Sequence, residues 1–103
     1  MREVQKPYKM FFETLGNVKR WEIVRLLEKG PQGATDIARN LSHEQSLISH
    51  HLRRLEDCGF IHVKQSGKRR VYTLNAKTMR PLLKLMHTHI HAYCATRGRC
   101  ICC

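Results

Sequence analysis

The stretch SLISHHLRRLEDCGF, residues 46–60, carries side chains suited to contact a nucleic acid. On a helix with about 3.6 residues per turn, one side gathers short polar groups, an imidazole and a long cation: Ser46, Ser49, His50 and Arg53. The opposite side is aliphatic and carries Ile48, Leu52 and Leu55. Arginine can bind guanine through two hydrogen bonds, and serine or histidine can contact base edges or phosphates. The pattern predicts a helix that enters the major groove of DNA, although an ordinary solvated helix face would look the same.

Cysteine is the second residue type that could do chemistry here. The chain has five cysteines, four of them in its last ten residues: Cys58, Cys94, Cys100, Cys102 and Cys103. A disulfide scaffold would spread cysteines through the sequence, so this distribution favours free thiols in a reducing compartment, the cytoplasm. Thiolates are soft ligands that suit As(III), Cd(II) or Zn(II), and Cys100 and Cys102 could hold one ion through a short loop. Arg97 and Arg99 would favour the thiolate form.

Other interpretations of the cysteines stay open. The C-terminal group could form a disulfide or a persulfide and act as a redox switch, or it could have no role. Cys58 could be a small apolar residue at a helix end. The last four residues, CICC, also fit a lipidation pattern, but no polybasic membrane signal accompanies them.

Two histidines add a second metal-binding pattern. His87, His91 and Cys94 recur at spacings of four and three residues, so they share one face of a helix. Such a face can chelate a transition metal. It can equally be the polar side of a helix whose other side packs against a second subunit.

Length and charge limit the classes of protein. A chain of 103 residues suits one domain. Nineteen Lys and Arg against eight Asp and Glu give a net charge of +11, which attracts DNA, RNA or an acidic membrane surface. No apolar run approaches the ~20 residues of a membrane span, and we expect neither a signal peptide nor a membrane partner. There is no nucleophile–base pair, phosphate loop or carboxylate pair in the sequence, so we expect a binding protein and not an enzyme.

The hydrophobic pattern predicts a mainly α fold with a small β-hairpin. Five helices are expected: one that follows Pro7 and ends at Gly16, one from near Asn17 to Gly30, and three over 34–40, 44–58 and 77–95. Pro81 would then lie in the first turn of the last helix, where proline is tolerated. The hairpin is expected over 60–74, with a basic turn at Ser66-Gly67-Lys68.

The order of these elements predicts a winged helix-turn-helix. The short helix over 34–40 and the turn after it complete a helix-turn-helix in which residues 46–58 form the second helix. The hairpin that follows offers cations to a phosphate backbone: Lys64, Lys68, Arg69 and Arg70. Its position favours DNA binding over a merely solvated face. We expect residues 1–96 to form one DNA-binding and dimerisation domain and residues 97–103 to form a cysteine-rich tail.

The segment ATDIARNLSHEQSLISHHLRRLEDCGFIHVKQSGKRRVYTLN, residues 34–75, resembles the winged helix of the ArsR/SmtB metal-sensing repressors. The resemblance rests on S-x-x-S-H-H-L, then R-x-L-x-x-x-G, then the wing G-K-R-R-V-Y, and it extends loosely over both flanks. It implies a homodimer, joined through the first and last helices, that represses a promoter until an inducer binds. One departure is Ser42, where the family usually has a turn glycine. Ser42 could instead cap the next helix together with Gln45.

The pattern and the resemblance together define an expected DNA-binding set: Gln45, Ser46, Ser49, His50, Arg53, Lys64, Lys68, Arg69 and Arg70. The partner would be a double-stranded, partly palindromic operator with half-sites about 10 bp apart. His51 is expected to be either structural or DNA-facing, like His50. A basic protein that binds DNA or RNA without sensing anything is the alternative, and it would show no preference for a palindrome.

The resemblance also implies candidate inducer sites. A family site with two cysteines in the helix before the recognition helix is absent, because the matching positions lie near Gly33 and Thr35. A second family site on the last helix keeps only His89 of its four ligands. The positions matching that site are Ala76, Thr78, His89 and Ala92.

Cysteine sites of the family fit better. Cys58 matches a cysteine late in the recognition helix, and the C-terminal cysteines match those found beyond the last helix. The expected metal-ligand set is Cys58, Cys94, Cys100, Cys102 and Cys103, with His87 and His91 as further candidates. We therefore expect a repressor released when a soft ion such as As(III) or Cd(II) binds cysteines, or alternatively a thiol-redox-responsive repressor of the same fold.

Overall fold

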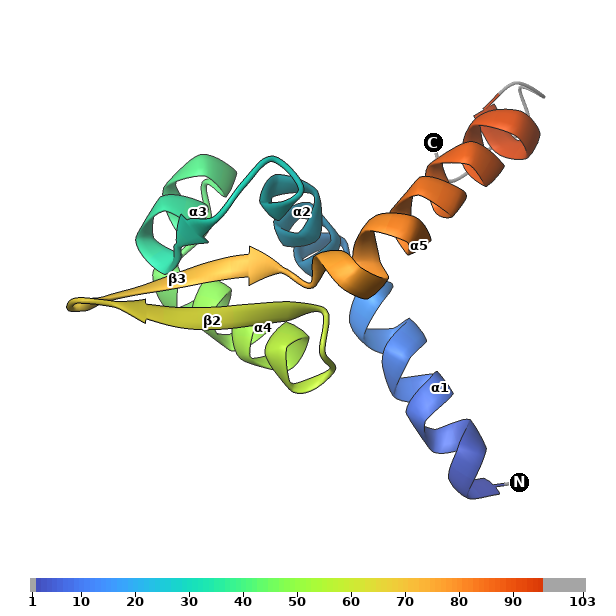
Figure 1. The fold of residues 1–103 in the computed structure, drawn as a ribbon, viewed down its shortest axis with the longest axis horizontal. Coiled ribbons are helices and arrows are strands. Elements are labelled where there is room, and N and C mark those ends of the chain that lie inside the picture. Colours follow the sequence, from blue (N-terminus) through green and yellow to red (C-terminus); the bar gives the residue numbers. More distant parts are fainter. Residues whose placement is uncertain (1, 96–103) are drawn as a thin grey trace.

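The computed structural model describes residues 2–95, and these form five α-helices, a π-helical segment and three strands (Figure 1). In chain order they are α1 (Arg2–Leu15), α2 (Val18–Leu27), β1 (Gln32–Gly33), α3 (Ala34–Leu41), α4 (Gln45–Asp57), β2 (Ile61–Ser66), β3 (Arg69–Leu74), α5 (Ala76–His89) and η1 (Ile90–Ala95). Helices α2, α3 and α4 and the strands form the body of the molecule. Helices α1 and α5 project from one side of it and diverge (Figure 1).

This arrangement confirms the predicted winged helix-turn-helix. Helices α3 and α4 are joined by a tight turn, and β2 and β3 form the wing directly after α4. The sheet has one more strand than expected, because Gln32–Gly33 pairs with β3 in the antiparallel order β1-β3-β2. That pairing places Gly33 opposite Val71, so the start of α3 is tied to the wing.

One hydrophobic core joins the three body helices, the strands and the base of α5. The buried residues are Ile23, Val24, Leu27, Ile37, Ala38, Ile48, Leu52, Leu55, Phe60, Ile61, Tyr72, Leu74, Met79 and Leu83. The spacing of three or four residues within α4 and of two residues within β3 matches one inward face on each element. The core thus fixes which side of α4 remains exposed.

Two of the three prolines, Pro7 and Pro81, lie deeper in their helices than the sequence pattern indicates. Helix α1 begins at Arg2, and Pro7 lies inside it, so the prediction that this helix starts after Pro7 is wrong. Proline in a helix removes one backbone hydrogen bond and crowds the carbonyl four residues earlier, although its fixed φ is compatible with a helix. Helix α5 begins at Ala76, so Pro81 lies in its second turn and not in its first. No helix of residues 2–95 has both the length and the apolarity to cross a membrane.

The turn between α3 and α4 corrects a second expectation. Ser42 does not cap α4, because it is the C-terminal cap of α3 with φ 56° and ψ 43°. The N-cap of α4 is Glu44, and its side chain makes no capping hydrogen bond. The position needs a left-handed backbone, and this explains why a glycine is usual there. Helix α2 begins close to the expected position, and its N-cap is Asn17, whose Oδ1 accepts from the backbone N–H of Arg20 at 3.1 Å.

Candidate nucleic-acid interface

Helix α4 presents the predicted polar strip to the outside. Its aliphatic side, Ile48, Leu52 and Leu55, is 0% exposed and packs in the core. Its opposite side is exposed throughout: Gln45, Ser46, Ser49, His50 and Arg53. Burial of three aliphatic side chains anchors the helix, so the strip has a fixed direction relative to the body.

A groove of about 900 Å³ separates this strip from the wing. It is lined by Ser46, Ser49, His50, Arg53, Glu56, Asp57, Arg70 and Tyr72. The two carboxylates at the C-terminal end of α4 did not enter the sequence prediction. Because carboxylates repel phosphate, the C-terminal end of α4 is less suited to a polyanion than its first three turns. Their position three and four residues after Arg53 was a usable signal, since such residues share a helix face.

The wing divides its cations between two faces. Residues opposite each other in β2 and β3 share a face, and the register pairs Gln65 with Arg70 and Lys64 with Val71. Arg70 lies on the same face as buried Tyr72, and both line the groove beside α4. Lys64 lies on the opposite face. The sequence prediction grouped these cations together and did not separate the two faces.

Lys68 and Arg69 lie at the tip of the wing. The two strands are joined through Gly67 and Lys68, and Gly67 has φ 62°, which suits a tight hairpin turn. Lys68 is exposed. Arg69 Nη2 instead donates to Asp36 Oδ2 of α3 at 2.8 Å. The cations of the wing therefore differ in their partners. Among the predicted wing contacts, only Arg69 has a carboxylate partner within the described residues.

A polar cluster centred on Thr14 holds α1 and α2 against α4. The Thr14 side chain is fully buried, and its Oγ1 accepts from Arg54 Nε at 3.2 Å and lies 3.3 Å from Cys58 Sγ. Arg20 Nε donates to the Thr14 carbonyl at 2.7 Å. Burial and the neighbouring Arg54 lower the pKa of Arg20, while Cys58 raises it. No spacing or motif in the sequence predicts this cluster, which supports α4 from behind.

The predicted metal ligands lie in different parts of the molecule. Cys58 is half-buried at the end of α4, and Cys94 is half-buried in η1. Cys100, Cys102 and Cys103 lie outside the described residues. Within residues 2–95, no group of three His, Cys, Asp or Glu side chains could hold a metal ion. A cysteine site would therefore need the C-terminal residues or a second subunit, and it stays a prediction.

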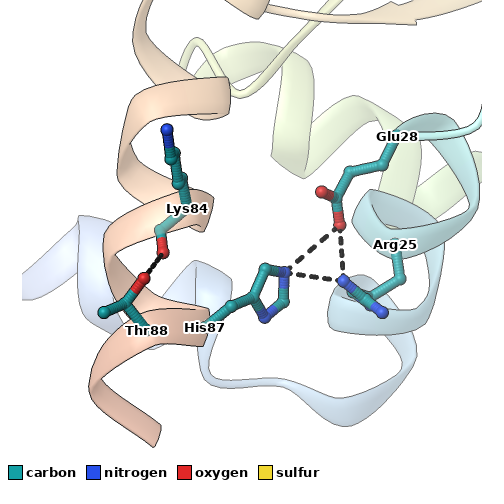
Figure 2. A network of polar contacts seen from close by, with 5 residues as sticks. All are labelled: Arg25, Glu28, Lys84, His87 and Thr88. Atoms are coloured by element: carbon teal, nitrogen blue, oxygen red, sulfur yellow. Dashed lines mark hydrogen bonds and ion pairs between the residues drawn. The ribbon is translucent and has the colours of Figure 1, made fainter. Parts of the chain in front are cut away.

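His87 joins α5 to α2 (Figure 2). Its Nε2 lies 2.6 Å from Arg25 Nη1 and 3.7 Å from Glu28 Oε1, while Arg25 also pairs with Glu28 at 2.9 Å. Arginine can only donate, so Nε2 is the acceptor in the contact with Arg25. His91, the other predicted histidine ligand, is exposed in η1. The two histidines therefore have different surroundings despite their helical spacing.

Comparisons with known proteins agree with this geometry. A family model described as "Bacterial regulatory protein, arsR family" matches residues 17–63. The HTH-type transcriptional regulator NmtR of Mycobacterium tuberculosis is 33% identical over 82 residues, which cover 77% of this chain and 68% of the relative. The arsenical resistance operon repressor of Staphylococcus xylosus is 29% identical over 70 residues, covering 68% of this chain and 67% of the relative.

A solved structure supports the fold. The homodimeric winged helix-turn-helix DNA-binding domain of a possible ArsR-family regulator from Mycobacterium bovis superposes with a TM-score of 0.84. It covers 92% of this chain and 88% of that one, at 19% sequence identity. These matches confirm the prediction of a DNA-binding transcription regulator that is not an enzyme. In sequence and in fold, the chain belongs to the arsR family of bacterial regulatory proteins.

Proposed function

We propose that the chain is a homodimeric transcriptional repressor that places α4 in the major groove of a partly palindromic operator. The observation that carries this proposal is the exposed polar strip of α4, backed by fully buried Ile48, Leu52 and Leu55. The proposed contacts are Gln45, Ser46, Ser49, His50 and Arg53 from α4, with Lys64, Lys68 and Arg70 from the wing. Arg53 would bind guanine, and the wing cations would bind phosphates.

Exposed apolar residues on the two projecting helices support a homodimer. They are Tyr8 and Phe12 on α1, at 62% and 67% exposed, and Leu85, Ile90 and Tyr93 on α5 and η1, at 69%, 41% and 58% exposed. Large apolar side chains on helices that stand away from the body are typical of a protein–protein interface. The homodimeric domain from Mycobacterium bovis has the same fold. Sedimentation of the wild-type protein and a Phe12→Lys variant tests this interface, since the variant should shift toward monomer.

The operator can be found by selection. Wild-type protein would be used to select duplexes from a library randomised over about 30 bp, which spans two half-sites about 10 bp apart. We expect an enriched, partly palindromic sequence whose binding weakens steeply with salt, because Lys and Arg displace counterions from phosphates. Recovery of duplexes without a common sequence would instead indicate general DNA or RNA binding. The enriched duplex is called the selected duplex below.

Soft ions bound by cysteine are the proposed inducers. Thiolates suit As(III), Cd(II) and Zn(II), and the relative from Staphylococcus xylosus is named an arsenical resistance operon repressor. Cys58 fits such a role by position, because its sulfur touches Thr14 and thereby lies where α1 meets α4. An ion held by Cys58 or Cys94 would need further ligands from Cys100, Cys102 or Cys103, or from a second subunit. The proposed setting is the cytoplasm, where these thiols stay reduced.

The inducer experiment separates a metal response from a redox response. The selected duplex bound to protein would be titrated with arsenite, Cd(II) and Zn(II), using wild type, Cys58→Ser and a triple variant with serine at 100, 102 and 103. We expect ion-dependent release of the wild type and reduced release of one or both variants. Equal release from all three proteins would exclude these cysteines. Release by an oxidant in the absence of metal would favour a thiol-redox-responsive repressor.

A further inference from the structure

The contact between Arg69 and Asp36 joins the wing to the helix-turn-helix. Arg69 begins β3, and Asp36 lies in the first turn of α3, where a carboxylate is favourable at the helix N-terminus. Their 2.8 Å hydrogen bond is also an ion pair, and Arg39 Nη1 lies 3.7 Å from the other carboxylate oxygen. The Asp36 carboxylate thus faces two guanidinium groups, one from its own helix and one from the wing.

Gly33 gives the Arg69 side chain its route to Asp36. A Cβ atom at position 33 would lie 3.0 Å from Arg69 Nη2 and 3.8 Å from Arg69 Cζ. The guanidinium therefore lies across the face of the glycine backbone, in space that most side chains would fill. Gly33 is buried and pairs with Val71 in the sheet. The ion pair and the β1–β3 pairing together hold the start of α3 against the wing.

Arg70 lies on the opposite face of the wing from Arg69. Strand alternation sends Arg69 and Arg70 to opposite faces of the hairpin, and Arg70 lines the groove beside α4. Arg69 Nη2 would have to release Asp36 before that nitrogen could bind a phosphate. The Arg69 guanidinium already has a carboxylate partner in the free protein, whereas Arg70 has none within the described residues.

We propose that Arg69 is a positioning residue for DNA binding: its ion pair with Asp36, laid across Gly33, fixes the wing against α3 so that Lys68 and Arg70 meet the DNA backbone. This role replaces the phosphate contact that the sequence pattern predicts for Arg69. It rests on the proposed operator binding, because the affinity measurements need a selected duplex. The contribution of the Arg69–Asp36 ion pair to the fold can be measured without DNA.

The direction in which Asp36→Asn changes DNA affinity distinguishes a positioning role of Arg69 from a phosphate contact. If Arg69 positions the wing, Asp36→Asn and Arg69→Gln should each weaken binding of the selected duplex by about threefold to tenfold, and the double variant should lose no more than either one. If Arg69 instead binds phosphate, Asp36→Asn should strengthen binding, since it frees a cation and removes a negative charge. Asp57→Asn is the matched control, because it removes the same charge beside the groove and should not weaken binding.

Hydrogen exchange of the free protein provides the second readout. Asp36→Asn and Arg69→Gln each remove the Arg69–Asp36 ion pair. Both variants should therefore show faster exchange of the backbone amides in Gln32–Gly33 and at Val71. Arg70→Gln should leave those amides unchanged. The proposal would be overturned if Asp36→Asn bound DNA more strongly, or if Asp57→Asn lost as much affinity as Asp36→Asn. Unchanged amide exchange in both Asp36→Asn and Arg69→Gln would overturn it as well. If the wild type selects no duplex, the proposed operator binding fails. The exchange data still decide whether the Arg69–Asp36 ion pair holds β1 against the wing.

Discussion

The guanidinium of Arg20 in α2 donates to Nδ1 of His51 in α4 across 3.3 Å. Because arginine can only donate, Nδ1 accepts, and the proton of the neutral imidazole lies on Nε2. His51 is only 6% exposed. Burial lowers the pKa of His51, and the charges of Arg20, His50, Lys19 and His43 lower it further. The recognition helix is therefore supported by a histidine that the fold keeps neutral.

This contact predicts that the protein loses stability in mild acid. The folded pKa of His51 lies below the ordinary value of 6.5, so the unfolded chain binds more protons as the pH falls. The stabilising contribution of neutral His51 is complete above pH 6.5 and is lost as the pH falls from there toward the folded pKa. The free energy of unfolding, measured in urea from about pH 8 to about pH 5, should therefore decrease across that window.

A glutamine at position 51 tests the cause. His51→Gln keeps an acceptor for Arg20 but cannot become charged, so the free energy of unfolding should depend less on pH than in the wild type. His62→Gln changes a histidine that is exposed on β2 and should keep the wild-type pH dependence. An unchanged pH profile in His51→Gln would mean that another group controls the acid sensitivity.

Thr14 is predicted to stabilise the junction of α1 and α4 through its hydroxyl. Thr14→Val keeps the side-chain shape but removes the acceptor for Arg54 Nε and the partner of Cys58. Leaving a charged donor without its partner in a part-buried site should cost about 1–3 kcal/mol of unfolding free energy. Thr78→Val, on an exposed position of α5, should cost much less. Equal losses in urea unfolding would show that the hydroxyl of Thr14 contributes nothing specific.

Ser42 is predicted to be a strained residue that glycine would relieve. Its φ of 56° places it in the left-handed region, which costs a residue with a Cβ about 1 kcal/mol or more relative to glycine. Ser42→Gly should therefore raise the melting temperature. Ser46→Gly makes the same exchange inside α4 and should lower the melting temperature, because glycine is a poor helix former. A lower melting temperature for Ser42→Gly would contradict the strain.

The spacing of apolar residues predicts which sides of α4 and of the wing strands are buried, because these sides depend only on residues close in sequence. The spacing of Ile48, Leu52 and Leu55 determines the inner side of α4, and these residues are fully buried. The same spacing includes His51, three residues after Ile48 and four before Leu55. Its burial could therefore have been predicted from the sequence, although His50 and His51 were interpreted as a pair. Strand alternation likewise separates Lys64 from Arg70.

Contacts between distant residues could not be predicted in the same way. Thr14 meets Cys58 from 44 positions away, and Arg69 meets Asp36 from 33 positions away. Each contact exists because two elements are packed at a particular angle, and nothing in either local sequence specifies the partner. Sequence alone therefore could not show that Arg69 has a carboxylate partner, because only the tertiary fold brings Asp36 to it.

Arg53 is predicted to determine sequence preference. It is exposed on the strip of α4 and lines the groove beside the wing. If it binds a guanine, Arg53→Ala should weaken the selected duplex by about 1–3 kcal/mol and weaken random DNA much less, so that discrimination between the two falls. Both affinities would be measured at the same salt concentration, since the phosphate contribution changes with salt.

The control for Arg53 removes the same charge elsewhere. Arg80 is exposed on α5, away from the strip, and Arg80→Ala should change both affinities little and by equal factors. Lys68→Ala should weaken both duplexes alike and reduce the salt dependence, as expected for a phosphate contact. If Arg53→Ala instead binds the selected and random duplexes as the wild type does, the exposed side of α4 is not the side that contacts the bases.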